Sequence, residues 1–237
     1  MSTDAPNVVV ALDYSDPDQA RRFVAKLPTD GCCLKVGKEL FVSGGPGLVE
    51  AWVKAGWRVF LDLKFHDIPH TVAAACRAAT DLGVWMIDVH ALGGTEMLEA
   101  ARGAVREISA DRPLLVAVTV LTSHHAGTLT QIGLNGTPEQ AVSRLAHLAY
   151  DVGLDGVVCS GNEVSDLRQS LAGNWRFVTP GIRPRGSEKN DQKRVMTPEA
   201  AVQAGATDLV IGRPITNAAD PAKALAQVQS AIHRTDF

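Results

Sequence analysis

The stretch Trp57-Arg-Val-Phe-Leu-Asp-Leu-Lys-Phe-His-Asp-Ile-Pro-His-Thr71 carries the chain from an apolar strand-like run into a helix that Pro69 opens. Side chains two residues apart on a strand leave the same face, so Asp62 and Lys64 are expected together. Asp67 falls in the turn before the helix. Charges withdrawn from water must be paired, so two carboxylates around one amine at the end of a buried strand mark a candidate functional site.

The same alternation of apolar strand and amphipathic helix runs along the whole chain. Strands are expected over residues 8–13, 33–37, 58–65, 85–91, 114–121, 156–160, 176–182 and 208–213. Helices are expected over residues 17–27, 44–53, 69–82, 95–108, 138–152 and 163–171, from residue 197, and over 220–233. Apolar strands joined by crossover helices predict a parallel sheet. Eight such units in 237 residues favour an α/β protein with a closed (β/α)8 TIM barrel.

Residues 1–237 are expected to form a single (β/α)8-barrel catalytic domain, because no linker or shift in composition divides the chain. A doubly wound open sheet is the alternative architecture. It is disfavoured because no Gly-x-Gly-x-x-Gly turn follows the first expected strand.

The composition is that of an ordinary globular protein, with 46% apolar residues, 21% charged residues and a formal net charge of −3. Neither the net charge nor any run of lysine and arginine favours a nucleic-acid partner. No secretory signal is evident and the apolar runs have only strand length, so we expect no membrane partner and a cytoplasmic location. The four cysteines, at positions 32, 33, 76 and 159, lack metal-site spacing and are expected to be reduced and mostly buried.

Polar residues gather where the expected strands end, and in a barrel those ends converge on one mouth. Lys35, Asp62, Lys64 and Asp67 form a row of alternating charge there, in which each carboxylate keeps a neighbouring ammonium charged. A fixed ammonium suits a reaction that builds negative charge on carbon, since it stabilises that charge and can then donate a proton. The alternative is an ion-pair cluster that only stabilises the barrel.

Two further segments suggest an anionic ligand. Gly212-Arg-Pro-Ile215 follows the eighth expected strand, where barrels often bind phosphate through backbone N–H groups and an arginine; the alternative is an ordinary surface turn. Residues 184–194 contain almost no apolar side chain. They form either a solvated loop or a lid that closes on the ligand through Arg183 and Gln192.

A metal site is not expected. Asp88 and His90 share a strand face, but a third ligand is not evident. Lys35 and Lys64 in the same mouth would also repel a divalent cation.

The stretch Asp62-Leu-Lys-Phe-His-Asp-Ile-Pro-His-Thr71 resembles the Asp-x-Lys-x-x-Asp-Ile-Pro-x-Thr signature of the orotidine 5'-monophosphate decarboxylase family. The resemblance covers the whole chain. The other matching segments, in the order of the family, are Ala11-Leu-Asp13, Leu34-Lys-Val-Gly37, Asp88-Val-His-Ala91, Val120-Leu-Thr-Ser123, Thr179-Pro-Gly-Ile-Arg183 and Val210-Ile-Gly-Arg-Pro-Ile215.

This resemblance implies the cofactor-free decarboxylation of orotidine 5'-monophosphate to uridine 5'-monophosphate, the last step of pyrimidine nucleotide synthesis. It implies that Lys64 stabilises and protonates the carbanion, with Asp62 beside the departing carboxylate. The implied substrate contacts are Asp13 and Lys35 on the ribose, Thr122 and Ser123 on the pyrimidine, and Arg183, Gln192, Gly212 and Arg213 on the phosphate.

The resemblance also implies a homodimer with shared active sites, which Asp67, Ile68 and Thr71 enter from the partner subunit. A related sugar-phosphate decarboxylase that needs Mg²⁺ is one rival, but it would need an acidic ligand on the second strand, where this chain has Lys35. A catalytically inactive barrel that only binds a nucleotide is the other rival.

Overall fold

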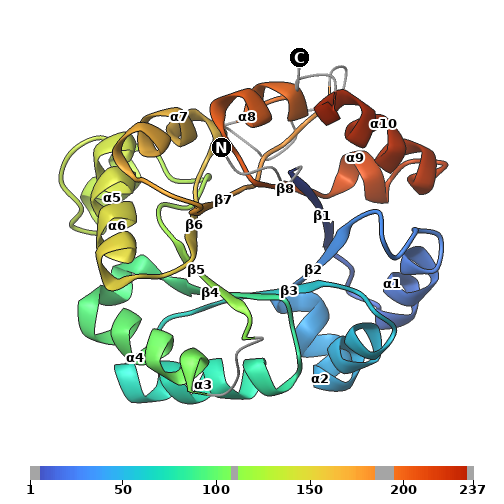
Figure 1. Ribbon diagram of the computed structural model, residues 1–237, viewed down its shortest axis with the longest axis horizontal. Coiled ribbons are helices and arrows are strands. Elements are labelled where there is room, and N and C mark those ends of the chain that lie inside the picture. Colours follow the sequence, from blue (N-terminus) through green and yellow to red (C-terminus); the bar gives the residue numbers. More distant parts are fainter. Residues whose placement is uncertain (1–5, 108–111, 185–194, 234–237) are drawn as a thin grey trace.

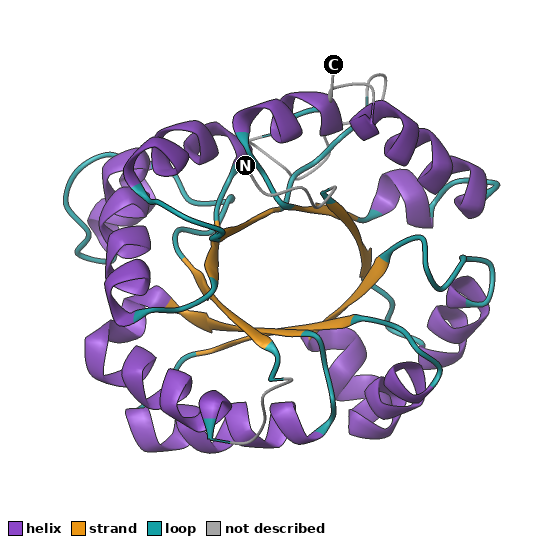
Figure 2. Ribbon diagram, viewed as in Figure 1, coloured by secondary structure: helices purple, strands orange, loops and turns teal. Residues whose placement is uncertain are grey.

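The computed structural model describes residues 6–107, 112–184 and 195–233. Eight parallel strands close into a barrel in chain order, and the helices form a layer around it (Figures 1 and 2). The first strand pairs with the last, Val9 lying opposite Val210. The predicted (β/α)8 barrel is therefore confirmed, and the open-sheet alternative is wrong. None of the helices described is both long and apolar enough to cross a bilayer.

The elements follow the expected order. The strands are β1 (Asn7–Leu12), β2 (Cys33–Gly37), β3 (Val59–Phe65), β4 (Met86–His90), β5 (Leu114–Val118), β6 (Gly156–Val158), β7 (Arg176–Thr179) and β8 (Asp208–Ile211). The helices are α1 (Pro17–Val24), α2 (Lys38–Lys54), α3 (Pro69–Asp81), η1 (Ala91–Gly93), α4 (Gly94–Arg106), α5 (Ala126–Gln131), α6 (Pro138–Val152), α7 (Gly161–Ser170), α8 (Pro198–Ala204), α9 (Arg213–Thr216) and α10 (Pro221–His233).

Alternation along the strands divides the apolar interior into two regions. In β1, Val8 and Val10 belong to the large cluster between the strands and the helices, whereas Val9 belongs to a smaller cluster inside the barrel. The members of this inner cluster are Val9, Ala11, Cys33, Phe60, Met86, Val116, Val178 and Val210, and all are buried. They fill the barrel below the mouth, so the centre of the barrel is a packed core.

A polar network fixes the amino-terminal end of the barrel. Asp208, the first residue of β8, is fully buried and accepts hydrogen bonds from Arg176 Nε at 2.9 Å and from its terminal nitrogen at 2.6 Å. Asn7 and Thr207 donate to the same carboxylate at 2.8 and 2.7 Å. A buried carboxylate with this many partners stabilises the pairing of β7, β8 and β1.

Two helices differ from the sequence-based expectation. The helix expected over residues 44–53 begins at Lys38 and bends at Gly45, whose φ of +68° only glycine adopts without strain. The segment between the strand expected over residues 114–121 and the helix expected over 138–152, to which no element was assigned, contains the short helix α5.

Several strands also end earlier than expected, among them β5 at Val118 and β7 at Thr179. The residues beyond these ends lie in the loops of the mouth. Candidate site residues such as Thr122 and Arg183 therefore lie several residues beyond the ends of their strands instead of directly after them.

Candidate active site

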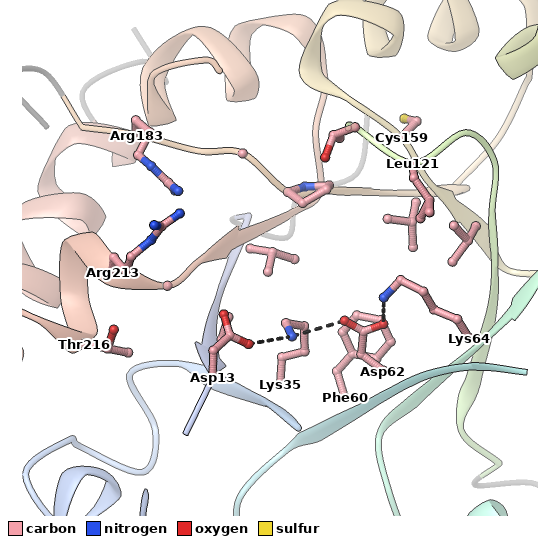
Figure 3. Close-up of a pocket in the computed structure, with 18 of the residues that line it drawn as sticks. Asp13, Lys35, Phe60, Asp62, Lys64, Leu121, Cys159, Arg183, Arg213 and Thr216 are labelled. Carbon is pink, nitrogen blue, oxygen red and sulfur yellow. Dashed lines mark hydrogen bonds and ion pairs between the residues drawn. The ribbon is translucent and has the colours of Figure 1, made fainter. Parts of the chain in front are cut away.

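A cavity of about 600 Å³ lies at the carboxyl ends of the strands (Figure 3). Eight of the residues proposed from the sequence line it: Asp13, Lys35, Asp62, Lys64, Thr122, Arg183, Gly212 and Arg213. They come from segments up to 200 residues apart, since position 13 and position 213 are both included. The barrel thus brings three members of the predicted charged row, Lys35, Asp62 and Lys64, into one space with Arg183, Gly212 and Arg213.

The charged residues form a continuous row along the floor of the cavity (Figure 3). Lys35 Nζ lies 3.1 Å from Asp62 Oδ2 and 3.5 Å from Asp13 Oδ1. Lys64 Nζ forms an ion pair with the other oxygen of Asp62. The order along the row is therefore Asp13, Lys35, Asp62, Lys64, with Asp62 held between two ammonium groups.

Mutual pairing keeps the two buried members of the row, Lys35 and Asp62, ionised although both are largely withdrawn from water. Burial alone would raise the pKa of the Asp62 carboxyl, but Lys35 and Lys64 together lower that pKa well below its usual range. Burial would lower the pKa of Lys35, and Asp62 followed by Asp13 outweighs it, so the pKa of Lys35 is raised. Two fixed ammonium groups beside one carboxylate create a preorganised electrostatic site.

The backbone at Lys64 is unusual. Its φ of +54° makes it the one residue other than glycine with a positive φ in the described part of the chain. The pairing of β3 with β4 shifts there: Leu61 lies opposite Ile87, but Phe65 lies opposite Val89. This shift is a β-bulge. Asp62 and Lys64 both enter the cavity, as expected, but the alternation of a regular strand is not what places them there.

Asp88 on β4 faces this bulge. Its Oδ1 accepts the backbone N–H of Lys64 at 2.8 Å, and its Oδ2 lies 4.0 Å from Lys64 Nζ. The residue is fully buried. Burial, and then the negative charge of Asp62, raises the pKa of Asp88 well above its usual range. Sequence reasoning considered Asp88 only as a metal ligand and missed its contact with Lys64.

The other end of the cavity is basic. Figure 3 shows Arg183 and Arg213 at the end of the cavity opposite Lys64, with their guanidinium groups converging inside the cavity. Arg183 is only 8% exposed and donates to the carbonyl oxygen of Ile182 at 2.9 Å. Arg213 opens α9 directly after Gly212. Two converging guanidinium groups favour a doubly charged anion such as a phosphate monoester.

Five proposed residues are not among those lining the cavity of a single chain. Asp67, Ile68, Thr71 and Ser123 are exposed on the surface. Asp67 does not cap α3: its Oδ1 accepts the N–H of Ile68 at 2.7 Å, and Ile68 is the residue before the helix. Gln192 and the proposed lid residues 185–194 lie outside the described part of the chain.

The cavity also contains residues that sequence reasoning did not select. Leu121, Cys159 and Phe60 add an apolar wall near the charged row, and Tyr14 lies beyond Asp13. Tyr14, Leu121 and Cys159 lie in the loops after their strands, which sequence periodicity does not resolve, whereas Phe60 belongs to β3. Within residues 6–107, 112–184 and 195–233, no cluster of three or more His, Cys, Asp or Glu side chains is arranged to hold a metal ion.

The fold and this cavity together define a (β/α)8-barrel protein with its candidate active site at the carboxyl ends of the strands. The cavity combines a row of alternating charge with an end that carries two arginines. The chain belongs to the orotidine 5'-phosphate decarboxylase / HUMPS family, whose model matches residues 6–228.

Curated relatives and solved structures agree with this assignment. The chain is 54% identical over 229 residues to the orotidine 5'-phosphate decarboxylase of Hydrogenovibrio crunogenus, covering 97% of each protein. It is 56% identical over 225 residues to that of Chromobacterium violaceum, covering 95% of this chain and 91% of the relative. The crystal structure of orotidine 5'-phosphate decarboxylase from Lactobacillus acidophilus superposes with a TM-score of 0.87 at 36% identity, covering 97% of this chain and 99% of that structure.

Proposed function

We propose that this protein is a carboxy-lyase that converts orotidine 5'-monophosphate to uridine 5'-monophosphate and carbon dioxide in pyrimidine biosynthesis, without a cofactor. The observation that carries the proposal is the row of Lys35, Asp62 and Lys64 in the cavity. The curated relatives of this chain are named orotidine 5'-phosphate decarboxylase. A fixed ammonium is what this reaction needs, because carbon–carbon cleavage leaves an electron pair on the pyrimidine carbon.

In the proposed mechanism the bond between the ring carbon and the carboxylate breaks, and its electron pair stays on the ring. The Lys64 ammonium stabilises that carbanion and then transfers a proton to it, which leaves Lys64 as a neutral amine to be reprotonated from solvent. Asp62 lies beside the departing carboxylate and holds Lys64 in place through their ion pair. Lys35 holds Asp62 from its other side at 3.1 Å.

The substrate is proposed to span the cavity from the charged row to the two arginines. Asp13 and Lys35 bind the ribose hydroxyls, and Thr122 with Ser123 recognises the pyrimidine. Arg183, Gln192, Gly212 and Arg213 bind the phosphate. Contacts so far from the reacting carbon contribute to catalysis when their binding energy holds the substrate in its reactive geometry.

The active form is proposed to be a homodimer that shares its two sites. Asp67, Ile68 and Thr71 are exposed and do not line the cavity of their own chain. Ile68 leaves 66% of its surface exposed, which is unusual for an isoleucine at the start of a helix. These features support a position of the three residues in the partner's active site. A cytoplasmic location completes the proposal, and the four free, buried cysteines are in keeping with it.

The test is the ultraviolet absorbance change of orotidine 5'-monophosphate with the purified protein, followed with and without a chelator. Turnover that is unaffected by the chelator is the expected result. Absence of turnover with this nucleotide, together with Mg²⁺-dependent decarboxylation of a sugar phosphate, would favour the sugar-phosphate decarboxylase rival. Binding of the nucleotide without turnover of either substrate would favour the inactive barrel. The first rival is disfavoured in advance because Lys35 occupies β2 at the mouth.

A further inference from the structure

We propose that Asp88 is a positioning residue for Lys64: its carboxyl group holds the bulge of β3 in the conformation that places the Lys64 ammonium beside Asp62. The catalytic meaning of this inference rests on the proposed function. The placement itself is a property of the fold that can be tested without the reaction.

The bulge leaves the backbone N–H of Lys64 without an acceptor in the strand ladder, and Asp88 supplies one. Three residues of β3, at positions 62 to 64, lie between the pairs Leu61–Ile87 and Phe65–Val89, whereas β4 supplies only Asp88 over the same interval. A bulge of this kind interrupts the ladder, so the backbone N–H of Lys64 needs an acceptor from a side chain. Asp88 Oδ1 provides it at 2.8 Å.

The conformation stabilised by this bond is one that lysine disfavours. A positive φ is strained for a residue with a side chain and persists only when surrounding contacts enforce it. Glycine could adopt the same backbone without strain, but it would carry no amine into the cavity. The chain therefore combines a glycine-like backbone at Lys64 with a fixed acceptor on the neighbouring strand.

The second oxygen of Asp88 connects it to the charged row. Oδ2 is buried and receives no hydrogen bond from the residues that the structure describes, and it lies 4.0 Å from Lys64 Nζ. A proton on Asp88 would turn its contact with the Asp62 carboxylate into a hydrogen bond and remove the repulsion between them. The raised pKa of Asp88 favours that neutral form. Asp88 then supports both members of the Lys64–Asp62 pair.

If Asp88 is neutral and positions Lys64, a conservative variant and a disruptive variant of Asp88 should differ clearly in kcat. Asparagine offers the same acceptor for the Lys64 N–H and an amide donor for Asp62, so Asp88→Asn is expected to keep kcat within about threefold of wild type. Asp88→Leu removes both oxygens but keeps the branched outline of the side chain, and it is expected to lower kcat roughly 10- to 100-fold, since a small misplacement of a catalytic group has effects of that size. KM is expected to change little, because the arginine end of the cavity is untouched.

Asp208→Ala is the matched control. Asp208 is a second fully buried aspartate, but it lies at the amino-terminal end of the barrel. Its removal is expected to lower stability while kcat per folded enzyme stays at the wild-type value. Asp88→Ala serves as the second disruptive variant if Asp88→Leu does not fold.

Crystal structures of the variants give a readout that does not depend on turnover. Lys64 is expected to keep its positive φ in Asp88→Asn and to lose it, with displacement of its amine from Asp62, in Asp88→Leu or Asp88→Ala. A loss of kcat in Asp88→Asn as large as in Asp88→Leu would overturn the proposal, as would an unchanged Lys64 backbone in the disruptive variants. If the wild-type protein does not decarboxylate the nucleotide, the proposed function fails, and the crystal structures still decide whether Asp88 positions Lys64.

Discussion

Replacing Lys64 by alanine tests the centre of the proposed mechanism. The ammonium of Lys64 is paired with Asp62, and its side chain is 23% exposed, so it acts in a setting between water and dry protein. A unit charge about 4 Å from a developing carbanion contributes about 4 kcal/mol at an effective dielectric constant near 20. Loss of that stabilisation corresponds to roughly a thousandfold in kcat/KM, and loss of the proton donor adds to it.

The assay is the decrease in absorbance of orotidine 5'-monophosphate, with kcat and KM determined separately for the wild type and Lys64→Ala. The fall is expected in kcat, because the charge that Lys64 stabilises exists only in the transition state. Lys54→Ala is the control: this lysine is the last residue of α2, its side chain is 78% exposed, and it does not line the cavity. It is expected to retain wild-type kinetics. A loss of only tenfold in Lys64→Ala would refute the assignment of Lys64 as the proton donor.

Three further predictions address the dimer, the phosphate end and the amino-terminal end of the barrel. If the sites are shared, mixing Asp67→Ala with Lys64→Ala protein in equal amounts should restore about a quarter of wild-type activity, because half of the dimers are hybrids with one intact site; no recovery after verified subunit exchange would contradict sharing. Arg213→Ala should lower kcat/KM about 10- to 100-fold through loss of a charged hydrogen bond, and weakened inhibition by inorganic phosphate would locate the effect; unchanged inhibition would place the phosphate elsewhere. Asp208→Ala should lower the free energy of unfolding by roughly 3 kcal/mol in urea titrations, since it leaves Arg176 without its buried partner; a change below 1 kcal/mol would mean the network contributes little.

The barrel itself could be predicted from the sequence because its strands are continuous apolar runs separated by helices. Eight such runs lie in the order in which the strands pair, and no other architecture accommodates that pattern as well. The row of Lys35, Asp62 and Lys64 was also predictable, since residues at the ends of parallel strands converge. The start of α2 was misjudged because Gly45 and Pro46 suggested that the helix begins there. Glycine at a positive φ instead lets a helix that begins at Lys38 bend and continue.

The backbone of Lys64 and its contact with Asp88 could not be predicted. The rule of alternating faces assumes a regular strand, and the bulge in β3 breaks that assumption at the residue of greatest interest. Asp88 is 24 residues further along the chain, and its acceptor role depends on the register between β3 and β4. Register across a bulge is a property of three-dimensional packing, which a single sequence does not reveal.

The packed inner cluster beneath the charged row limits how substrate enters the cavity and how products leave it. Phe60, Met86 and Val116 are buried in that cluster, so in the described part of the chain the candidate active site is closed at its inner end and opens to solvent only at the mouth. In the proposed mechanism the nucleotide, the carbon dioxide and the proton that returns to Lys64 would all enter or leave through this opening. With one opening, a product that still occupies the mouth delays the release of the other. Exchange of labelled carbon dioxide into the nucleotide on the enzyme would show which product leaves first.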